Sequence, residues 1–329
     1  MPNKLLFSIL IPNLGYSYLL FECLDSVVCQ ETNSEFNYEI VLCDQSDLDA
    51  HEKIKNEIIS RYGSGKINLI HSNIKSLYQA RHTLMKRAHG DYVVFIDSDD
   101  FVDKNYLAEL YKIIKDKNNP DVILTDYTLC SFDKKKTKSN LYLQNLNRGR
   151  FLDYLCIANE INNVWAKIFR KDLYDIKDYG NFKYPLIKCG EDKIFSTPFM
   201  KKAKKIYCAC GFVHYYYRNT PNSMAKKPSL YDLNALLEYL FLNLDFNDLD
   251  RFKRQLLADY ICALFSILSQ KHNKTGFKEF RNYARRFQIL IKRASLKVNG
   301  IDMKFKKRVF LVFLRKKLYV SLYIASFFI

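Results

Sequence analysis

With 329 residues, 48% of them hydrophobic and 15% aromatic, the chain is too apolar to be disordered and long enough for one catalytic unit plus an appendage. Its net charge of +17 is unevenly spread, because residues 251–329 carry 19 Lys and Arg against 3 Asp and Glu. A nearly neutral body with a strongly basic C-terminal region predicts an appendage that meets an anionic partner.

The first 125 residues alternate apolar runs with helical patterns. Strands are expected at residues 5–12, 38–43, 67–71, 92–96 and 122–125, and helices at 18–30, 50–62, 77–88 and 106–115. Strands and helices that alternate through short loops form parallel pairs with right-handed crossovers. The pattern therefore predicts an α/β fold with a doubly wound, mostly parallel sheet flanked by helices.

The pattern changes again in the second half of the chain. Residues 151–228 are irregular, with short helices and turn signals, and Pro228 is expected to mark a boundary. Helices are expected after it at residues 230–244, 249–269, 277–296 and from 304 onward. We therefore expect a first domain at 1–228 and a basic helical region at 229–329.

The basic helical region has several candidate partners. Its apolar runs at 309–314 and 318–329 are shorter than the roughly 20 residues that span a bilayer. Cations between apolar runs favour peripheral attachment to the anionic inner surface of the cell membrane. A helical module for homo-oligomerisation is the alternative, and we expect no nucleic-acid partner.

The cysteines and the N-terminal residues indicate the cellular compartment of the protein. The nine cysteines show no disulfide or zinc spacing, since Cys208 and Cys210 are separated by one residue rather than two. We expect reduced thiols in a cytoplasmic protein. Residues 5–11 resemble a strand rather than a secretion signal, so no signal peptide is expected.

An acidic cluster after the predicted strand 92–96 is the strongest chemical signal. Asp97, Asp99 and Asp100 surround Ser98 where the strand would leave the core. Carboxylates this close raise one another's pKa unless a cation or hydrogen-bond donors hold them. Oxygen ligands suit Mg²⁺ or Mn²⁺ rather than zinc, and open α/β sheets bind ligands at the carboxyl ends of their strands. The alternative is a polar loop with a helix cap.

Polar groups also follow the earlier predicted strands. Pro12 and Asn13 end the first strand and Asp44 ends the second, while Arg81 lies near the start of the helix after the third. A carboxylate can accept a hydrogen bond from a base or ribose, and an arginine can meet phosphate oxygens. Asp44 alone fits a turn and Arg81 alone fits a surface charge, but their order predicts a nucleotide site.

The ordered motifs resemble those of family 2 glycosyltransferases of the GT-A fold, in the branch that makes bacterial surface polysaccharides. The resemblance covers about residues 4–225. The matching segments are residues 7–12 (FSILIP), 24–27 with Gln30, 39–46 (EIVLCDQS), 80–81, 88–92, 95–100 (FIDSDD), 163–170 (NVWAKIFR), 190–195 (GEDKIF), 216–218 and 222–223.

The resemblance implies a role for each motif. The nucleotide-binding half would be about 1–100 and the acceptor half about 101–228. The nucleotide of a UDP-sugar donor would be held by Pro12, Asn13, Asp44, Arg81, Asp97 and Ser98. Asp99, together with Asp97, would bind Mn²⁺ or Mg²⁺ on the diphosphate. Asp192 would be the catalytic base and Glu191 would orient the acceptor, so that the sugar transfers in one displacement with inversion.

Three further residues and two departures from the family pattern stay open. His214 is either a third metal ligand or a packed strand residue, Trp165 is core or an acceptor platform, and Lys167 is a candidate phosphate contact. Family members usually carry Thr-Tyr-Asn where this chain has residues 13–15 (NLG), and paired Asp residues where it has residues 43–44 (CD). Both departures leave the nucleobase less certain than the reaction class.

Together these features predict a transferase on the inner face of the cell membrane. It would build a bacterial surface glycan, such as lipooligosaccharide, capsule or O-antigen, on a glycan or lipid-linked acceptor. The alternative is a basic, non-enzymatic protein that binds nucleic acid or membrane on a degenerate GT-A scaffold. NAD and P-loop enzymes are disfavoured because no Gly-x-Gly-x-x-Gly or Walker lysine follows the first strand.

Overall fold

The computed structural model describes residues 5–32, 35–141, 143, 163–179, 182–220, 228–244, 251–270, 277–294 and 311–320. The chain divides into two compact units. The first comprises residues 1–148 and 162–223, and the second comprises 149–161 and 224–329.

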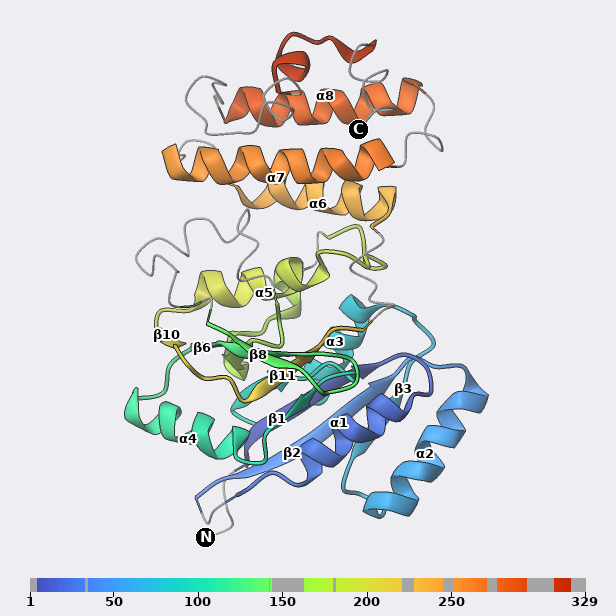
Figure 1. The fold of residues 1–329 in the computed structure, drawn as a ribbon, viewed down its shortest axis with the longest axis vertical. Helices are drawn as coiled ribbons and strands as arrows, with labels where there is room; N and C mark the ends of the chain where they lie inside the picture. Colours follow the sequence, from blue (N-terminus) through green and yellow to red (C-terminus); the bar gives the residue numbers. More distant parts are fainter. Residues whose placement is uncertain are drawn as a thin grey trace. The chain divides into compact units, whose positions relative to one another are not determined.

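The first unit is built on a seven-stranded sheet with the order β10-β6-β9-β4-β1-β2-β3 (Figure 1). Its strands are β1 (Leu5–Asn13), β2 (Asn37–Asp44), β3 (Asn68–His71), β4 (Tyr92–Phe95), β6 (Val122–Thr125), β9 (Lys167–Arg170) and β10 (Ile206–Ala209). All neighbouring pairs are parallel except those of β9, which runs antiparallel to β4 and β6. The predicted α/β fold with a mostly parallel sheet is confirmed.

Five α-helices lie in the described part of this unit. They are α1 (Tyr18–Val28), α2 (Leu48–Tyr62), α3 (Leu77–Arg87), α4 (Tyr106–Asp116) and α5 (Glu191–Lys202). The first three begin after a residue whose side chain accepts from the first turn, at Ser17, Asp47 and Ser76. Such caps satisfy backbone N–H groups that have no partner inside the helix. The expected helix boundaries therefore agree with the structure within a few residues.

A second, four-stranded sheet was not predicted. It has the order β5-β11-β7-β8, with β5 (Phe101–Val102), β7 (Tyr127–Cys130), β8 (Thr137–Asn140) and β11 (Tyr215–Arg218). These strands have two to four residues, which is too short for an alternating pattern to be recognised. The stretch 151–228 that looked irregular also contains β9, β10 and α5. That expectation was wrong for its described part.

A glycine brings β1 and the turn before β4 into contact. A Cβ on Gly90 would lie 2.6 Å from the carbonyl carbon of Phe7 and 2.6 Å from the backbone nitrogen of Ser8. The Gly90 N–H donates to Ser8 Oγ at 2.8 Å. Only glycine fits this approach, which aligns β4 beside β1 and fixes where the acidic cluster leaves the sheet.

The described part of the second unit is helical. It contains α6 (Leu230–Asn243), α7 (Arg251–Gln270) and α8 (Phe277–Arg293), followed by a short helical stretch at 311–315. Contacts join α7 to both α6 and α8, and Asn234 of α6 donates to the Tyr283 hydroxyl of α8 at 2.7 Å. The predicted helix from residue 304 falls partly outside the described residues. Within the described ranges, none of the helices is both long enough and apolar enough to cross a bilayer.

Candidate active site

The predicted nucleotide residues gather where parallel strands end. β1 and β2 are paired in a register that sets Asn13 directly beside Asp44. The Asn13 side-chain amide donates to Asp44 Oδ1 at 2.9 Å and to the Gly15 carbonyl at 3.2 Å. Pro12 and Asn13 are both buried. Local strand pairing therefore brings these three predicted residues together at the carboxyl edge of the sheet.

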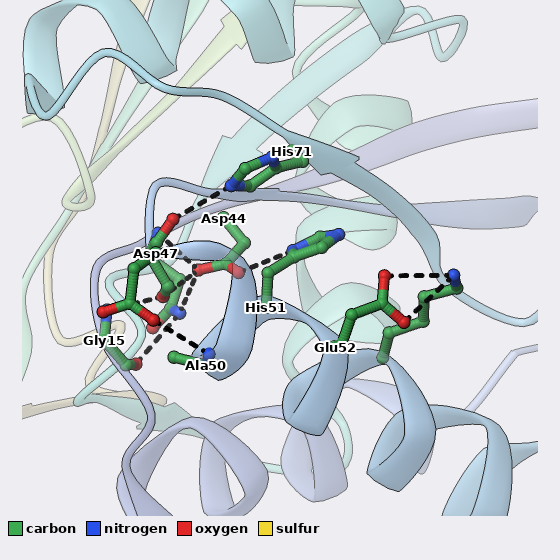
Figure 2. Close-up of polar contacts among 10 residues, drawn as sticks. Gly15, Asp44, Asp47, Ala50, His51, Glu52 and His71 are labelled. Carbon is green, nitrogen blue, oxygen red and sulfur yellow. Dashed lines mark hydrogen bonds and ion pairs between the residues drawn. The ribbon is translucent and has the colours of Figure 1, made fainter.

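Asp44 is fully buried and bonded on both carboxylate oxygens (Figure 2). Oδ1 also accepts from the Ser46 hydroxyl at 2.6 Å and the Ser46 backbone N–H at 3.2 Å, and Oδ2 lies 2.8 Å from His51 Nδ1. Three of these contacts fall on Oδ1 and one falls on Oδ2. In this state Asp44 fixes the shape of the loops, and Oδ2 keeps the acceptor capacity that one contact leaves on a carboxylate oxygen.

Two histidines near Asp44 were missed by sequence reasoning. The His51 ring packs against that of His71 in a tilted arrangement, with centroids 4.3 Å apart, and His71 Nε2 lies 2.9 Å from the Ser46 carbonyl oxygen. His51 belongs to α2 and His71 ends β3, so the pair connects the second and third strand ends (Figure 2). Nothing in the local sequence pattern indicated that these side chains would meet.

The acidic cluster contains two kinds of carboxylate. Asp100 is buried and accepts from the Tyr215 hydroxyl and from the Arg218 backbone N–H, each at 2.7 Å. Asp97 and Asp99 are half-buried, as is Ser98 between them. Asp100 therefore anchors the cluster to β11, while Asp97 and Asp99 remain the candidate ligands.

Burial is the main cause of the raised pKa values of Asp97 and Asp99. Burial raises the pKa of Asp97 to about 7, with Asp192 and Asp99 adding to the rise and Arg81 opposing it. Burial also raises the pKa of Asp99, against hydrogen bonds to its own backbone and to Thr220. A divalent cation beside these carboxyls would favour their ionised form against the effect of burial.

The residues fit such an ion only in part. No three His, Cys, Asp or Glu side chains converge as a metal site anywhere in the described ranges. Asp97 and Asp99 alone would leave an octahedral Mg²⁺ or Mn²⁺ open to other ligands. Mg²⁺ is commonly held in this way, by one or two carboxylates with substrate phosphates and water. The pair therefore fits a metal that arrives with a diphosphate.

His214 contacts Asp103, which is not one of the predicted metal ligands. Its Nδ1 lies 3.0 Å from Asp103 Oδ2, and its ring packs on Phe212 with centroids 4.8 Å apart. These contacts fit the packed-residue alternative. Metal ligation by His214 stays a prediction.

The two predicted catalytic residues, Glu191 and Asp192, begin α5. Gly190, with φ +88°, precedes the helix in the left-handed region that favours glycine. Glu191 and Asp192 follow in the first turn, where the positive end of the helix dipole stabilises carboxylates. Burial raises the pKa of Glu191 well above its usual range, and the neighbouring Asp192 adds to the rise.

Arg81 contacts Glu191 and Asp192 rather than Asp44. It is 1% exposed, its Nη2 lies 2.5 Å from Asp192 Oδ1, and its Nη1 lies 3.6 Å from Glu191 Oε1. The Val164 backbone N–H donates to the other Asp192 oxygen at 3.2 Å. Asp192 is thus held in place by a buried guanidinium and a backbone N–H.

Lys167 and Trp165 lie on or beside β9. Lys167 is fully buried, donates to the Asn163 carbonyl, and has its pKa lowered to about 7 by burial, with Asp192 opposing. Trp165 is 4% exposed and stacks between Tyr215 and Tyr217, with centroids 4.7 and 5.0 Å away. Trp165 is therefore core, and it supports the strand that anchors Asp100.

A comparison with known protein families shows to which family the chain belongs. A family model described as "Glycosyl transferase family 2" matches residues 8–176, which is more than half of the chain. The chain belongs to glycosyl transferase family 2. The matched region contains Asp44 with its partners Asn13, Ser46 and His51. It also contains Arg81 and the acidic cluster. Glu191 and Asp192 lie beyond it.

Named relatives of this family 2 member are bacterial. "Uncharacterized glycosyltransferase EpsJ" of Bacillus subtilis (strain 168) is 26% identical over 234 residues, which cover 68% of this chain and 64% of EpsJ. "Poly(ribitol-phosphate) beta-N-acetylglucosaminyltransferase TarP" of Staphylococcus aureus (strain N315) is 26% identical over 211 residues, or 63% of this chain and 61% of TarP. The chain thus spans less than two thirds of the length of these relatives.

A solved structure supports the fold of this family 2 member. The structure of S. aureus TarS 1-349 in complex with UDP-GlcNAc superposes with a TM-score of 0.66 at 20% identity, covering 98% of this chain and 90% of that chain. The similarity confirms the GT-A type of α/β fold.

Proposed function

We propose that the protein transfers a hexosyl or N-acetylhexosaminyl group from a UDP-sugar to a hydroxyl of a bacterial surface glycan. The observation that carries the proposal is Asp192, a carboxylate held by Arg81 and the Val164 N–H at the start of α5. Asp192 also contributes to the raised pKa of Asp97, so the base and the acidic cluster share one electrostatic site. General acid–base catalysis needs a side chain that is fixed within hydrogen-bond reach of the proton it accepts.

Asp192 would take the proton of the acceptor hydroxyl while that oxygen attacks the anomeric carbon. A single displacement of this kind inverts the configuration at that carbon. Glu191, whose raised pKa favours a protonated carboxyl, would donate a hydrogen bond that orients the acceptor. Mn²⁺ or Mg²⁺ held by Asp97 and Asp99 would supply charge neutralisation for the departing diphosphate.

The donor and the acceptor class rest on the relatives. TarS binds UDP-GlcNAc in the structure named above, and the name of TarP makes it an N-acetylglucosaminyltransferase that acts on poly(ribitol-phosphate). Both support a UDP-sugar donor and a surface polymer or its lipid-linked precursor as acceptor. We place the enzyme in the cytoplasm, peripheral to the inner face of the membrane, where such precursors are built; homo-oligomerisation stays a prediction.

The test is a panel of sugar nucleotides with Mn²⁺, read by thermal stabilisation and by release of UDP in the presence of glycan acceptors. Stabilisation by one UDP-sugar, followed by a product of inverted anomeric configuration in NMR spectra, would support the proposal. A non-enzymatic binder would instead show salt-sensitive retention on DNA or vesicles and no turnover with any donor.

A further inference from the structure

Helix α8 has one buried face and one basic face. Six apolar or aromatic residues are buried on it, and the rings of Phe280 and Phe287 lie 6.0 and 6.1 Å from Phe265 of α7. The exposed side chains on the other face are Lys278, Arg281, Asn282, Arg285, Ile289, Lys292 and Arg293. At 3.6 residues per turn these seven positions fall within an arc of about 120° and extend for about 20 Å. We call this face the α8 stripe.

The α8 stripe contains five cations and no acid. The one acidic residue of the helix, Glu279, lies outside the arc, about 100° from Lys278. Arg286, at the border of the stripe, bonds to Asn234 of α6 and is partly buried. Like charges one turn apart on a helix repel one another, and an anionic partner would relieve that repulsion.

A second basic segment adjoins the stripe. The Tyr319 hydroxyl donates to the side chain of Gln288, which sits at one edge of the stripe. Arg315, Lys316 and Lys317 are exposed a few residues earlier in the chain. Leu311 and Leu314 are buried, so this segment is packed in place.

Exposed apolar side chains are interleaved with these cations. Ile289 is 45% exposed in the middle of the stripe, and Leu318 and Val320 are 42% and 59% exposed on either side of Tyr319. Charge alone would suit any polyanion. Apolar side chains placed among cations gain free energy only where the anionic partner also offers hydrocarbon, as at the headgroup boundary of a lipid leaflet.

We propose that the α8 stripe and residues 315–320 bind the surface of a membrane that contains anionic lipids. The cations contact the headgroups, and Ile289, Leu318 and Val320 enter the boundary between headgroups and acyl chains. All residues of this surface belong to the second unit, and none of them is a candidate site residue of the first unit. Its binding can therefore be measured without a donor or acceptor, and its failure would leave the proposed transfer reaction untouched.

The test is co-sedimentation of the full chain with phosphatidylcholine vesicles, with and without phosphatidylglycerol. The triple variant Arg281→Gln, Arg285→Gln, Lys292→Gln should bind anionic vesicles about 100-fold more weakly than the wild type. The matched control Lys53→Gln, Lys66→Gln, Lys86→Gln removes the same charge from exposed positions of the first unit and should bind as the wild type does. Equal binding by the two triple variants would overturn the proposal.

A second arm separates a lipid surface from a soluble polyanion. Ile289→Ser should weaken binding to anionic vesicles several-fold, because it removes an inserted apolar side chain. It should leave retention on immobilised polyphosphate unchanged. If vesicle binding does not respond to Ile289→Ser, the surface recognises anionic charge alone and the membrane assignment is wrong.

Discussion

The guanidinium of Arg81 lies 2.5 Å from the Asp192 carboxylate, so the candidate base is paired with a buried cation before any ligand arrives. Arg81 comes from α3 and Asp192 from the first turn of α5, and the nucleotide role expected for Arg81 gave no hint of this partner. The pair connects α3 to the helix that carries the proposed catalytic carboxylates. Its consequences can be tested one side chain at a time.

Asp192→Asn should abolish transfer and spare donor binding. The amide keeps the size of the side chain and an oxygen for Arg81, but it cannot accept the acceptor proton. We expect kcat to fall by about 10²–10⁴-fold, the usual contribution of a general base. The Kd for UDP with Mn²⁺, measured by calorimetry, should stay within about twofold. Asp172→Asn, at an exposed carboxylate, serves as the control, and full activity in Asp192→Asn would remove this residue from the mechanism.

The Arg81–Asp192 pair should show strong energetic coupling. Because Arg81 is 1% exposed, its removal leaves Asp192 and Glu191 without their cation. Arg81→Gln should lower the free energy of unfolding by about 3 kcal/mol, as expected when a buried ion pair loses one partner. In a double-mutant cycle with Asp192→Asn, denaturant titrations should give a coupling of about 1–3 kcal/mol.

The exposed pair Arg61–Glu57 provides a matched control for this cycle. It has the same 2.5 Å separation, but its side chains are 45% and 24% exposed. Solvent screening should make its coupling much smaller. Equal coupling in the two cycles would show that burial adds nothing to the Arg81–Asp192 contact.

The neighbours Asp99 and Asp100 should respond in opposite ways to substitution. Asp99→Ala should remove the extra thermal stabilisation that Mn²⁺ gives with UDP, while changing the stability of the free protein little. Asp100→Ala leaves the Tyr215 hydroxyl and the Arg218 N–H without an acceptor, which should cost about 1–3 kcal/mol of folding stability. A chelator should lower the Tm of the wild type with UDP and leave that of Asp99→Ala unchanged. The metal assignment fails if Asp99→Ala keeps its response to Mn²⁺.

These residues show how much of the candidate site could be predicted from the sequence. Asp44 and Asp97 were predicted in place because each follows a continuous apolar strand, and parallel strands bring their ends to one edge of the sheet. The distinction between Asp99 and Asp100 could not be predicted. It depends on Tyr215, which is distant in the sequence and lies in a four-residue strand with no alternating pattern.

The same dependence on tertiary packing explains the other side-chain contacts that the sequence did not predict. The α5 start was recognisable from Gly190 and the acidic first turn, but its partner Arg81 depends on how α3 and α5 pack. The contact between His51 and His71 depends on the spacing of β2 and β3 and on the first turn of α2. Local pattern fixes elements and their ends, whereas pairings between side chains of distant elements are set by tertiary packing.

His82, next to Arg81 on α3, should make the protein sensitive to mild acid. It is 5% exposed among aromatic rings, its Nδ1 lies 2.9 Å from the Tyr174 hydroxyl, and burial lowers its pKa from 6.5 to about 4. Between these pH values the unfolded chain binds a proton that the folded chain refuses, so this side chain makes stability fall as pH drops from 6.5 to 4. The loss should reach about 3 kcal/mol.

The variant His82→Phe isolates this effect from other titrating groups. Phenylalanine can occupy the space among Tyr78, Tyr179 and Phe195 but takes up no proton. Buried carboxyls with raised pKa values, such as Asp97, act in the opposite direction and are shared by both proteins. The difference between the wild-type and variant unfolding free energies, measured from pH 7 to pH 4, should therefore shift in favour of the variant as the pH falls. A difference that stays constant over this range would mean that the folded protein accepts a proton on His82 as readily as the unfolded chain does.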